Sequence, residues 1–201
     1  MVACGLREQK KEATRVAILE VALDLFDRDG FEATTIEDIT AAAGVSPRTF
    51  FRYFESKVEL VIERKDQSHH GELRDLIMQR PADEHPLEAM RQVAESALRA
   101  SMADGGDVML RQIKILMNTP SLRAIGLEHF NDHRAEIGEA FAARLGVDET
   151  ALEPRVLAAV LPETLWVVIE EWLSEGADPS TLGGLIDRAF SVLYRGVTAV
   201  C

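Results

Sequence analysis

The chain has 201 residues, 47% of them apolar, with a formal net charge of −12 at pH 7, a composition that excludes a disordered chain. No apolar run is long enough to span a bilayer, and the first residues lack the apolar segment of a signal peptide. With two cysteines, Cys4 and Cys201, expected to be free thiols, we predict a cytoplasmic globular protein.

Apolar residues recur at helical spacing nearly throughout, which predicts an all-α fold of about nine helices. The first helix is expected from about Glu12 to Asp29, where Gly30 supplies a C-terminal stop. The second begins at Thr34 or Thr35, because each starts a Thr-x-x-acid pattern typical of a capping box.

The third and fourth helices follow from similar local signals. Gly44 permits a sharp turn, and Ser46 is expected to cap a helix that has Pro47 at its first position. Ser56 opens another capping-box pattern, which predicts a fourth helix to about Met78. After a loop from Pro81 to Pro86, amphipathic stretches predict further helices at 87–102, 107–117, 120–145, 151–175 and 179–199.

Residues 34–54 carry the strongest functional signal, two short helices joined by a tight turn, the build of a helix-turn-helix that reads duplex DNA. On a helical wheel Phe50 and Phe54 share the inner side with Pro47, and Phe51 lies at the border. The outer side carries the polar and basic residues of this helix, Arg48, Thr49, Arg52 and Tyr53.

These outer residues have the chemistry of base and phosphate recognition. Arginine can bond two acceptors of guanine, and threonine can contact a thymine methyl group. Tyr53 and Lys57 suit phosphate oxygens, and a bound phosphate would relieve the conflict between Lys57 and the dipole of the predicted fourth helix. Residues 1–65 carry 10 of the 22 basic and 12 of the 34 acidic side chains, so most of the acid excess lies elsewhere.

Three other readings remain open from the residues alone. The motif can be an ordinary helical hairpin with a solvated polar face, or the inert head of a helical adaptor. The chain can also be a helical hydrolase that uses scattered carboxylates and histidines, but it has no nucleophile elbow, glycine-rich phosphate loop or ordered triad. We therefore predict a DNA-binding regulator and no enzyme.

The segments 31–39, 44–46 and 49–60 resemble the N-terminal domain of TetR-family regulators, a likeness that covers about residues 12–64. Trp172-Leu173 and residues 187–190 look like the last two helices of many members. The resemblance implies that the DNA contacts are made by Thr34, Thr35, Ser46, Pro47, Arg48, Thr49, Phe51, Arg52, Tyr53 and Lys57.

The resemblance also implies a homodimer, usually a repressor, that leaves a palindromic operator when a small effector binds its C-terminal domain. No cofactor is expected. We accordingly predict a helix-turn-helix DNA-binding domain at 1–56, a connecting helix at 57–80 and a ligand-binding and dimerisation domain at 81–201.

The last two predicted helices carry wide apolar stripes, as expected of helices that are covered on two sides. They suit either an intersubunit four-helix bundle or the monomer core. The stripes consist of Leu157, Leu161, Leu165, Ile169 and Trp172 in one helix and Leu182, Leu185, Ile186, Ala189, Phe190, Leu193 and Val197 in the other.

Adaptable, aromatic and polar residues after the Pro81 loop are candidates for lining an effector pocket, although each also suits a core. The predicted ligand-binding residues are Met102, Met109, Ile113, Met117, Phe130, His133, Trp166 and Glu170. We expect a small, largely apolar effector, and the form of residues 49–54, similar to that of actinobacterial members, points to acyl-CoA or another lipid-like molecule. His129 and His133 are four residues apart, a spacing that can hold a metal, but we expect no metal site because the zinc-protease pattern is incomplete.

Overall fold

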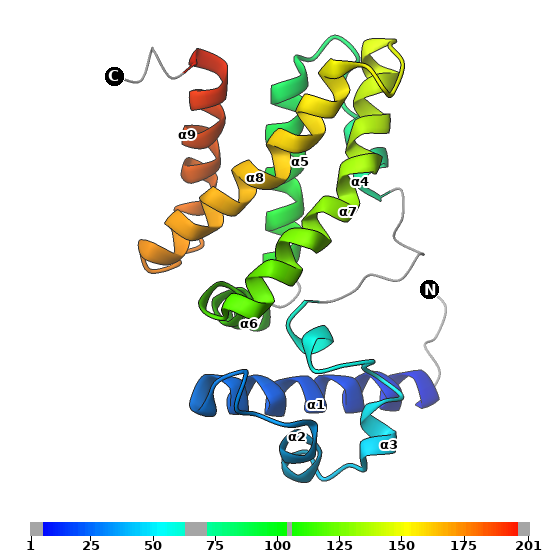
Figure 1. Cartoon of the computed structure of the whole chain (residues 1–201), viewed down its shortest axis with the longest axis vertical. Coiled ribbons are helices and arrows are strands. Elements are labelled where there is room, and N and C mark those ends of the chain that lie inside the picture. The colour runs from blue at the N-terminus through cyan, green and yellow to red at the C-terminus, as the bar shows by residue number, and fades with distance from the viewer. Residues whose placement is uncertain (1–5, 63–71, 104–105, 197–201) are drawn as a thin grey trace. The chain divides into compact units, whose positions relative to one another are not determined.

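The computed structural model describes residues 6–62, 72–103 and 106–196, except the side chains of 6–8, 72, 100–103 and 129–133. Within this part of the chain it is all-helical, as predicted, with nine α-helices, one 3-10 helix and no strand (Figure 1). None of these helices has the length and apolarity to cross a membrane. The elements are α1 (Leu6–Asp29), α2 (Ile36–Ala42), α3 (Pro47–Phe50), η1 (Val58–Leu60), α4 (Glu72–Met78), α5 (Pro86–Ala103), α6 (Gly106–Asn118), α7 (Pro120–Leu145), α8 (Leu152–Ser174) and α9 (Leu182–Arg195).

The chain forms two compact units that do not follow its order. The first combines residues 1–64 with 107–124, and the second combines 65–106 with 125–201. Helix α6 therefore belongs with the N-terminal helices, to which Arg111 binds through Asp24 and Asp27 of α1, both at 2.7 Å. The side-chain amide of Gln112 adds a hydrogen bond of 2.9 Å to the carbonyl oxygen of Leu60. This division rests on contacts within the chain and does not test the predicted division by function into 1–56, 57–80 and 81–201, which stays a prediction.

The core of the first unit contains the residues that the helical spacing selects. Apolar side chains of α1 pack with Ile39 of α2 and with the two inward phenylalanines at and after α3. The fully or almost fully buried residues are Ile18, Ala22, Leu23, Phe26, Ile39, Phe50, Phe54 and Leu60. Burial of this continuous apolar surface is the main term that stabilises the three-helix arrangement.

The predicted helix that starts at Ser56 is wrong in its first part. The chain makes only the 3-10 turn η1 there, and residues 63–71 of the prediction lie outside the described residues. The physical reason is burial, because Leu60, Val61 and Ile62 are all at most 7% exposed. Three successive side chains cannot share one face of an α-helix, so an amphipathic helix would have exposed one of them.

In the second unit, α9 packs against α5 and α8, and Trp172 of α8 and Phe190 of α9 are both at most 1% exposed. Arg144 of α7 ties down the turn after α4, because its guanidinium donates to four carbonyl oxygens, at distances from 2.7 to 3.2 Å. Those carbonyls belong to Ile77, Arg80, Pro81 and Glu84. The planar guanidinium suits this task because it presents five N–H donors in a fixed geometry.

Glu88 gives the second unit an acid-sensitive contact. Hydrogen bonds from Arg91 at 2.6 and 3.0 Å, and a further one from Gln92, outweigh desolvation and lower the pKa of Glu88 to about 2, from a usual value of 4.5. A depressed pKa contributes stability that is complete above pH 4.5 and is lost as the pH falls toward 2. We expect Glu88→Gln to flatten this part of the pH dependence in urea unfolding. Glu139→Gln, at an exposed position of α7, should keep the wild-type slope of unfolding free energy against pH. Equal slopes in the wild type and both variants would contradict the acid-sensitive role of Glu88.

Candidate nucleic-acid interface

The turn between α2 and α3 forms as its sequence predicts. Thr35 caps α2 in a reciprocal capping box, in which its hydroxyl accepts from the backbone N–H of Asp38 and the Asp38 carboxylate accepts from the backbone N–H of Thr35. Gly44 has φ +64°, a left-handed conformation that side chains with a Cβ rarely adopt. Ser46 caps α3 and accepts from the backbone N–H of Thr49 at 3.1 Å. These local contacts fix the direction in which α3 leaves the turn.

Helix α3 and the turn that continues it separate inward from outward residues. Phe50 and Phe54 are 0% and 2% exposed and their ring centroids lie 5.6 Å apart, whereas Phe51 is 55% exposed. An exposed phenylalanine next to two buried ones is available for contact with a partner. Pro47 is also exposed, so our prediction that it packs inward with Phe50 is wrong.

The outward side presents a basic and hydroxyl-bearing surface. Arg48 and Arg52 are exposed, and Thr49 and Tyr53 are half-buried. Arg52 donates to the phenol oxygen of Tyr53 at 3.0 Å and its guanidinium carbon stands 4.9 Å from the centre of that ring. This pairing holds Arg52 in one orientation and leaves its other N–H groups able to donate.

Two predicted contact residues have a structural task. Thr34 is 2% exposed and its hydroxyl donates to the carbonyl of Gly30, so the geometry does not support a side-chain contact with DNA. Lys57 donates to the carbonyl oxygens of Phe31 and Thr34 at 2.6 and 2.7 Å, and its ammonium lies over the Phe31 ring. The third proton of an ammonium can still reach a phosphate. The dipole argument for Lys57 fails, because no α-helix starts there.

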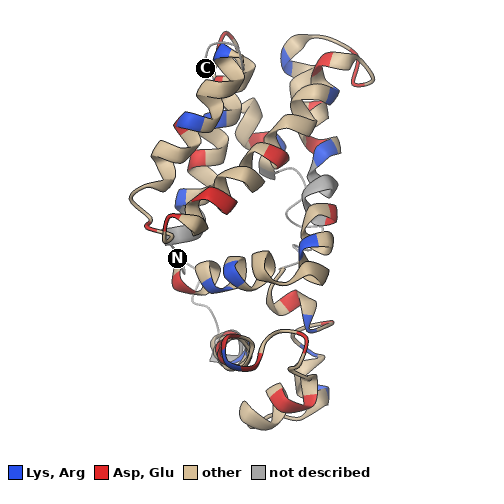
Figure 2. Ribbon diagram, turned by 60° about the vertical axis from the view of Figure 1, so that its left-hand side comes forward, with Lys and Arg blue, Asp and Glu red and all other residues tan. Residues whose placement is uncertain are grey.

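Charge is mixed along the ribbons of both units, as Figure 2 shows. The first turn of α2 carries Glu37 and Asp38, while α3 contains Arg48 and no acid. Within the first unit the recognition helix is therefore a local basic feature on an acidic chain. Local positive potential is what phosphate binding requires.

Sequence reasoning treated α1 only as a packing helix and so missed Lys11 and Thr14. The hydroxyl of Thr14 donates to the carbonyl oxygen of Lys10 at 2.8 Å. Desolvation acts to raise the pKa of Tyr53, but the influence of Arg52, Thr14 and Lys11 outweighs it and lowers the pKa. The pair Lys10-Lys11, next to the predicted start of the first helix, was the available signal.

The structure divides the predicted ligand-binding residues between units. Met109, Ile113 and Met117 lie on α6 in the first unit, half-buried or buried. Trp166 and Glu170 lie on α8 in the second unit, where the buried indole N–H of Trp166 donates to the exposed carboxylate of Glu170 at 3.2 Å. The side chains of Met102, Phe130 and His133 fall outside the described residues.

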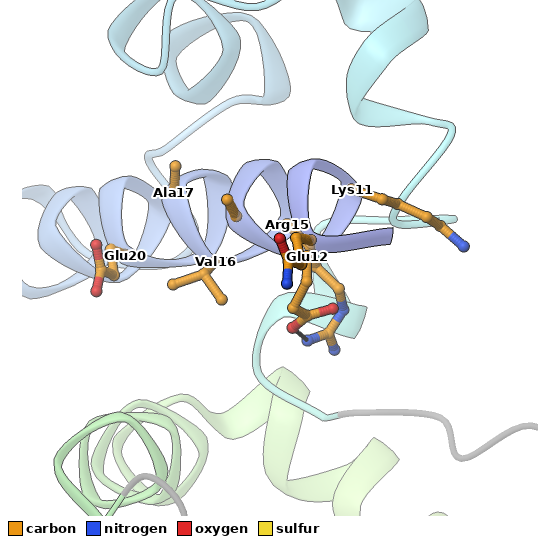
Figure 3. Close-up of a pocket in the computed structure, with 8 residues that line it drawn as sticks. Lys11, Glu12, Arg15, Val16, Ala17 and Glu20 are labelled. Atoms are coloured by element: carbon orange, nitrogen blue, oxygen red, sulfur yellow. Dashed lines mark ion pairs between the residues drawn. The ribbon is translucent and has the colours of Figure 1, made fainter. Parts of the chain in front are cut away.

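Two surface hollows lie elsewhere. One is lined by eight residues of α1, between Gln9 and Glu20, and Figure 3 shows the Glu12–Arg15 ion pair on its wall. The other lies over α7, α8 and the turn between them, with the exposed side chains of Leu152 and Val156 on it. Neither hollow includes a predicted ligand-binding residue. Among the side chains that the structure describes, no three metal-ligating groups lie together, and the side chains of His129 and His133 are not among those described.

Comparison with protein families gives two matches that together span most of the chain. The model described as "Bacterial regulatory proteins, tetR family" matches residues 18–63, the segment that holds α2 and α3. The model described as "MftR C-terminal domain" matches residues 84–198.

Individual proteins agree with these matches. The chain is 35% identical over 175 residues to the HTH-type transcriptional regulator TcmR of Streptomyces glaucescens, which covers 84% of this chain and 76% of TcmR. Among solved structures, NalD, the secondary repressor of the MexAB-OprM multidrug efflux pump in Pseudomonas aeruginosa, superposes with a TM-score of 0.61 at 23% identity, covering 91% of this chain and 96% of NalD. The SmeT–triclosan complex gives a TM-score of 0.61 at 22% identity, covering 90% of this chain and 91% of SmeT. These two structures establish the shared fold.

Proposed function

The chain belongs to the TetR family of bacterial regulatory proteins, and we propose that it is a repressor that binds a palindromic operator as a homodimer and leaves it when a small effector binds. Family membership makes the chain a DNA-binding transcriptional regulator and not an enzyme, which removes the hydrolase and adaptor readings. A regulator of bacterial transcription would act in the cytoplasm, where the chromosome lies.

The observation that carries this proposal is the outward side of α3. Capping by Ser46 and the left-handed turn at Gly44 orient α3 and the turn that continues it, which together expose Arg48, Phe51 and Arg52. Arginine can read guanine bidentately and an aromatic side chain can contact a thymine methyl group. Of the ten predicted contacts, we retain nine and assign Thr34 to the fold of the turn.

The test is selection of duplexes from a random-sequence pool by the purified full-length chain, beside a gel shift with the DNA that flanks its own gene. We expect an enriched two-fold-symmetric site with half-sites about one or more helical turns apart. Selection of asymmetric sites would contradict the dimeric reading, and no enrichment by a folded protein would contradict the proposed function.

The dimer is proposed to form through α8 and α9. Besides the side chains that α8 and α9 bury within the unit, both helices expose large apolar ones. These are Leu152, Val156 and Val167 on α8, from 49% to 69% exposed, and Val192 and Tyr194 on α9, 39% and 44% exposed. Apolar residues on both sides of a helix suit a four-helix bundle between subunits, because the second side needs a cover.

Val167→Glu should therefore dissociate the dimer. A carboxylate buried without a partner costs several kcal/mol, so we expect the dimer dissociation constant to rise by roughly 10-fold or more. Sedimentation equilibrium would measure it. Val147→Glu, an exposed valine outside both helices, is the matched control, and equal behaviour of the two variants would reject this interface.

The proposed effector remains small and largely apolar, with acyl-CoA or another lipid-like molecule as the first to test. Helix α6 supports a link between effector and DNA, because it carries three of the proposed ligand-binding residues and is joined to α1 by Arg111. Titration of the protein–DNA complex with acyl-CoAs of increasing chain length tests this. DNA release that depends on chain length would support a lipid-like effector, and the absence of release across the series would reject it.

A further inference from the structure

The exposed side of α8 carries a narrow acidic stripe around one valine. Val167 is 60% exposed, and the exposed side chains of Glu163 and Glu170 lie one turn before it and one turn after it. Because each residue advances by about 100°, the spacing i, i+4, i+7 keeps all three within about 60° of the helix circumference. The buried residues Leu161 and Trp172 lie on the opposite side of α8, so the acidic stripe faces away from the core of the unit.

The exposed side of α9 repeats this arrangement with the opposite charge. Arg188, Val192 and Arg195 have the same i, i+4, i+7 spacing and form a basic stripe. Val192 is 39% exposed, and the side chain of Arg188 is 70% exposed. The acid in the sequence of α9, Asp187, accepts a hydrogen bond from Arg91 of α5 at 2.7 Å, so its charge is engaged on the α5 side of the helix.

Contacts within the subunit leave the ends of these stripes available. Helices α8 and α9 pack against each other (Figure 1), but Arg188 pairs with Glu175, which follows the end of α8, at 3.8 Å. Within the described residues neither Glu163 nor Arg195 forms an ion pair. Glu170 accepts from the indole N–H of Trp166 on its own helix, and a carboxylate that accepts one hydrogen bond can accept others.

We propose that the two stripes meet across the dimer, so that the acids of α8 in one subunit pair with the arginines of α9 in the other. At a rise of 1.5 Å per residue, the charged residues of each stripe lie about 10.5 Å apart along the helix axis, so one register can form both pairs. Since each stripe has the same charge at both ends, each acid meets an arginine whichever way the partner helix runs. This inference rests on the proposed function, because it assigns the register of the same homodimer.

The pairing makes the dimer selective for a second copy of this chain. Complementary charges across an interface determine which partners associate, and in which register, more than they raise affinity. The exposed apolar side chains of α8 and α9 could also pack on similar helices of other chains. A chain with acids in place of Arg188 and Arg195 would oppose acid to acid, and such repulsion is how interfaces reject wrong partners.

Charge reversal tests the pairing by sedimentation equilibrium of the full chain. We expect Glu163→Arg/Glu170→Arg to oppose arginine to arginine across the interface and to raise the dimer dissociation constant by roughly 100-fold or more. Arg188→Glu/Arg195→Glu should have the same effect, because it opposes acid to acid. An equimolar mixture of the two variants should form a heterodimer with nearly the wild-type dissociation constant, since each subunit then supplies the charge that the other needs.

Glu153→Arg/Glu171→Arg is the matched control, because it reverses two exposed acids of α8 that lie outside the acidic stripe. We expect it to dimerise as the wild type does. All the substituted positions are exposed, so far-ultraviolet circular dichroism should show every variant folded. Equal weakening by the control would show a general effect of charge on α8 and would overturn the pairing. A mixture of the two stripe variants that stays monomeric would overturn it as well.

Failure of the pairing and failure of the proposed function give different results. If both stripe variants dimerise as the wild type does, the stripes do not meet, and the chain can still be a dimeric repressor. If the wild-type chain is monomeric at all concentrations and binds its DNA site as a monomer, the proposed homodimer and the pairing are overturned together.

Discussion

The double variant Arg48→Ala/Arg52→Ala is expected to lose specific binding to the selected operator. Both side chains are exposed, Arg48 on α3 and Arg52 in the turn that continues it. Each good bidentate contact contributes about 1–3 kcal/mol of discrimination against the wrong base. Loss of both therefore predicts an affinity for operator that is roughly 100-fold lower or more, near the non-specific level. Fluorescence anisotropy at fixed salt, with operator and scrambled duplexes, measures the difference.

Arg99→Ala provides the matched control for loss of an arginine. Arg99 lies on α5 in the second unit, has a side chain 74% exposed and pairs with Glu95 of its own helix. We expect this variant to bind operator as the wild type does. If the double variant keeps its affinity for operator, other residues must read the bases. The chain would still be a DNA-binding protein, but Arg48 and Arg52 would not be its base-reading residues.

The two single variants divide the roles further. Arg52 is held against Tyr53 by a hydrogen bond of 3.0 Å, whereas no hydrogen bond or ion pair is recorded for Arg48 within the described residues. Arg48 is therefore the better placed of the two to reach a base, and its single substitution should relax sequence preference more than that of Arg52.

The parts of the fold and site that the sequence predicts correctly are those set by local interactions. The cap at Ser46, the turn at Gly44 and the burial of Phe50 and Phe54 all depend on residues within a few positions of one another. Turn chemistry and helical periodicity depend on such short distances, so most of the structure of residues 34–54, though not the exposure of Pro47, could be predicted from the sequence.

The parts that the sequence does not predict depend on partners far along the chain. Arg111 pairs with Asp24 and Asp27, which lie more than 80 positions away in the sequence. Lys57 found two backbone carbonyls more than 20 positions earlier. The sequence does not show whether a basic side chain binds a phosphate or donates to a buried carbonyl oxygen. The helical periodicity predicts which residues are buried, but it does not predict their binding partners.

Phe50 and Phe51 are adjacent residues whose substitution should have opposite consequences. Phe50→Ala removes a side chain that is 0% exposed. Such a change lowers the free energy of unfolding by about 3–5 kcal/mol, enough to unfold much of the first unit. Phe51 is 55% exposed and its ring meets that of Phe50 edge-on at 5.4 Å. Phe51→Ala should therefore cost no more than about 1.5 kcal/mol, the usual limit for such an aromatic pair. Urea unfolding followed by circular dichroism compares the two variants.

The two variants should then lose DNA affinity by different routes. Phe50→Ala acts through the folded fraction, so low temperature or a stabilising osmolyte should restore much of its binding. Phe51→Ala leaves the first unit folded and removes an apolar contact with DNA, so neither treatment should restore its affinity for operator. Full affinity in folded Phe51→Ala would remove Phe51 from the interface. Its aromatic ring would then only cover Phe50, and the DNA contacts would be made by the arginine and hydroxyl groups of α3 and the turn that continues it.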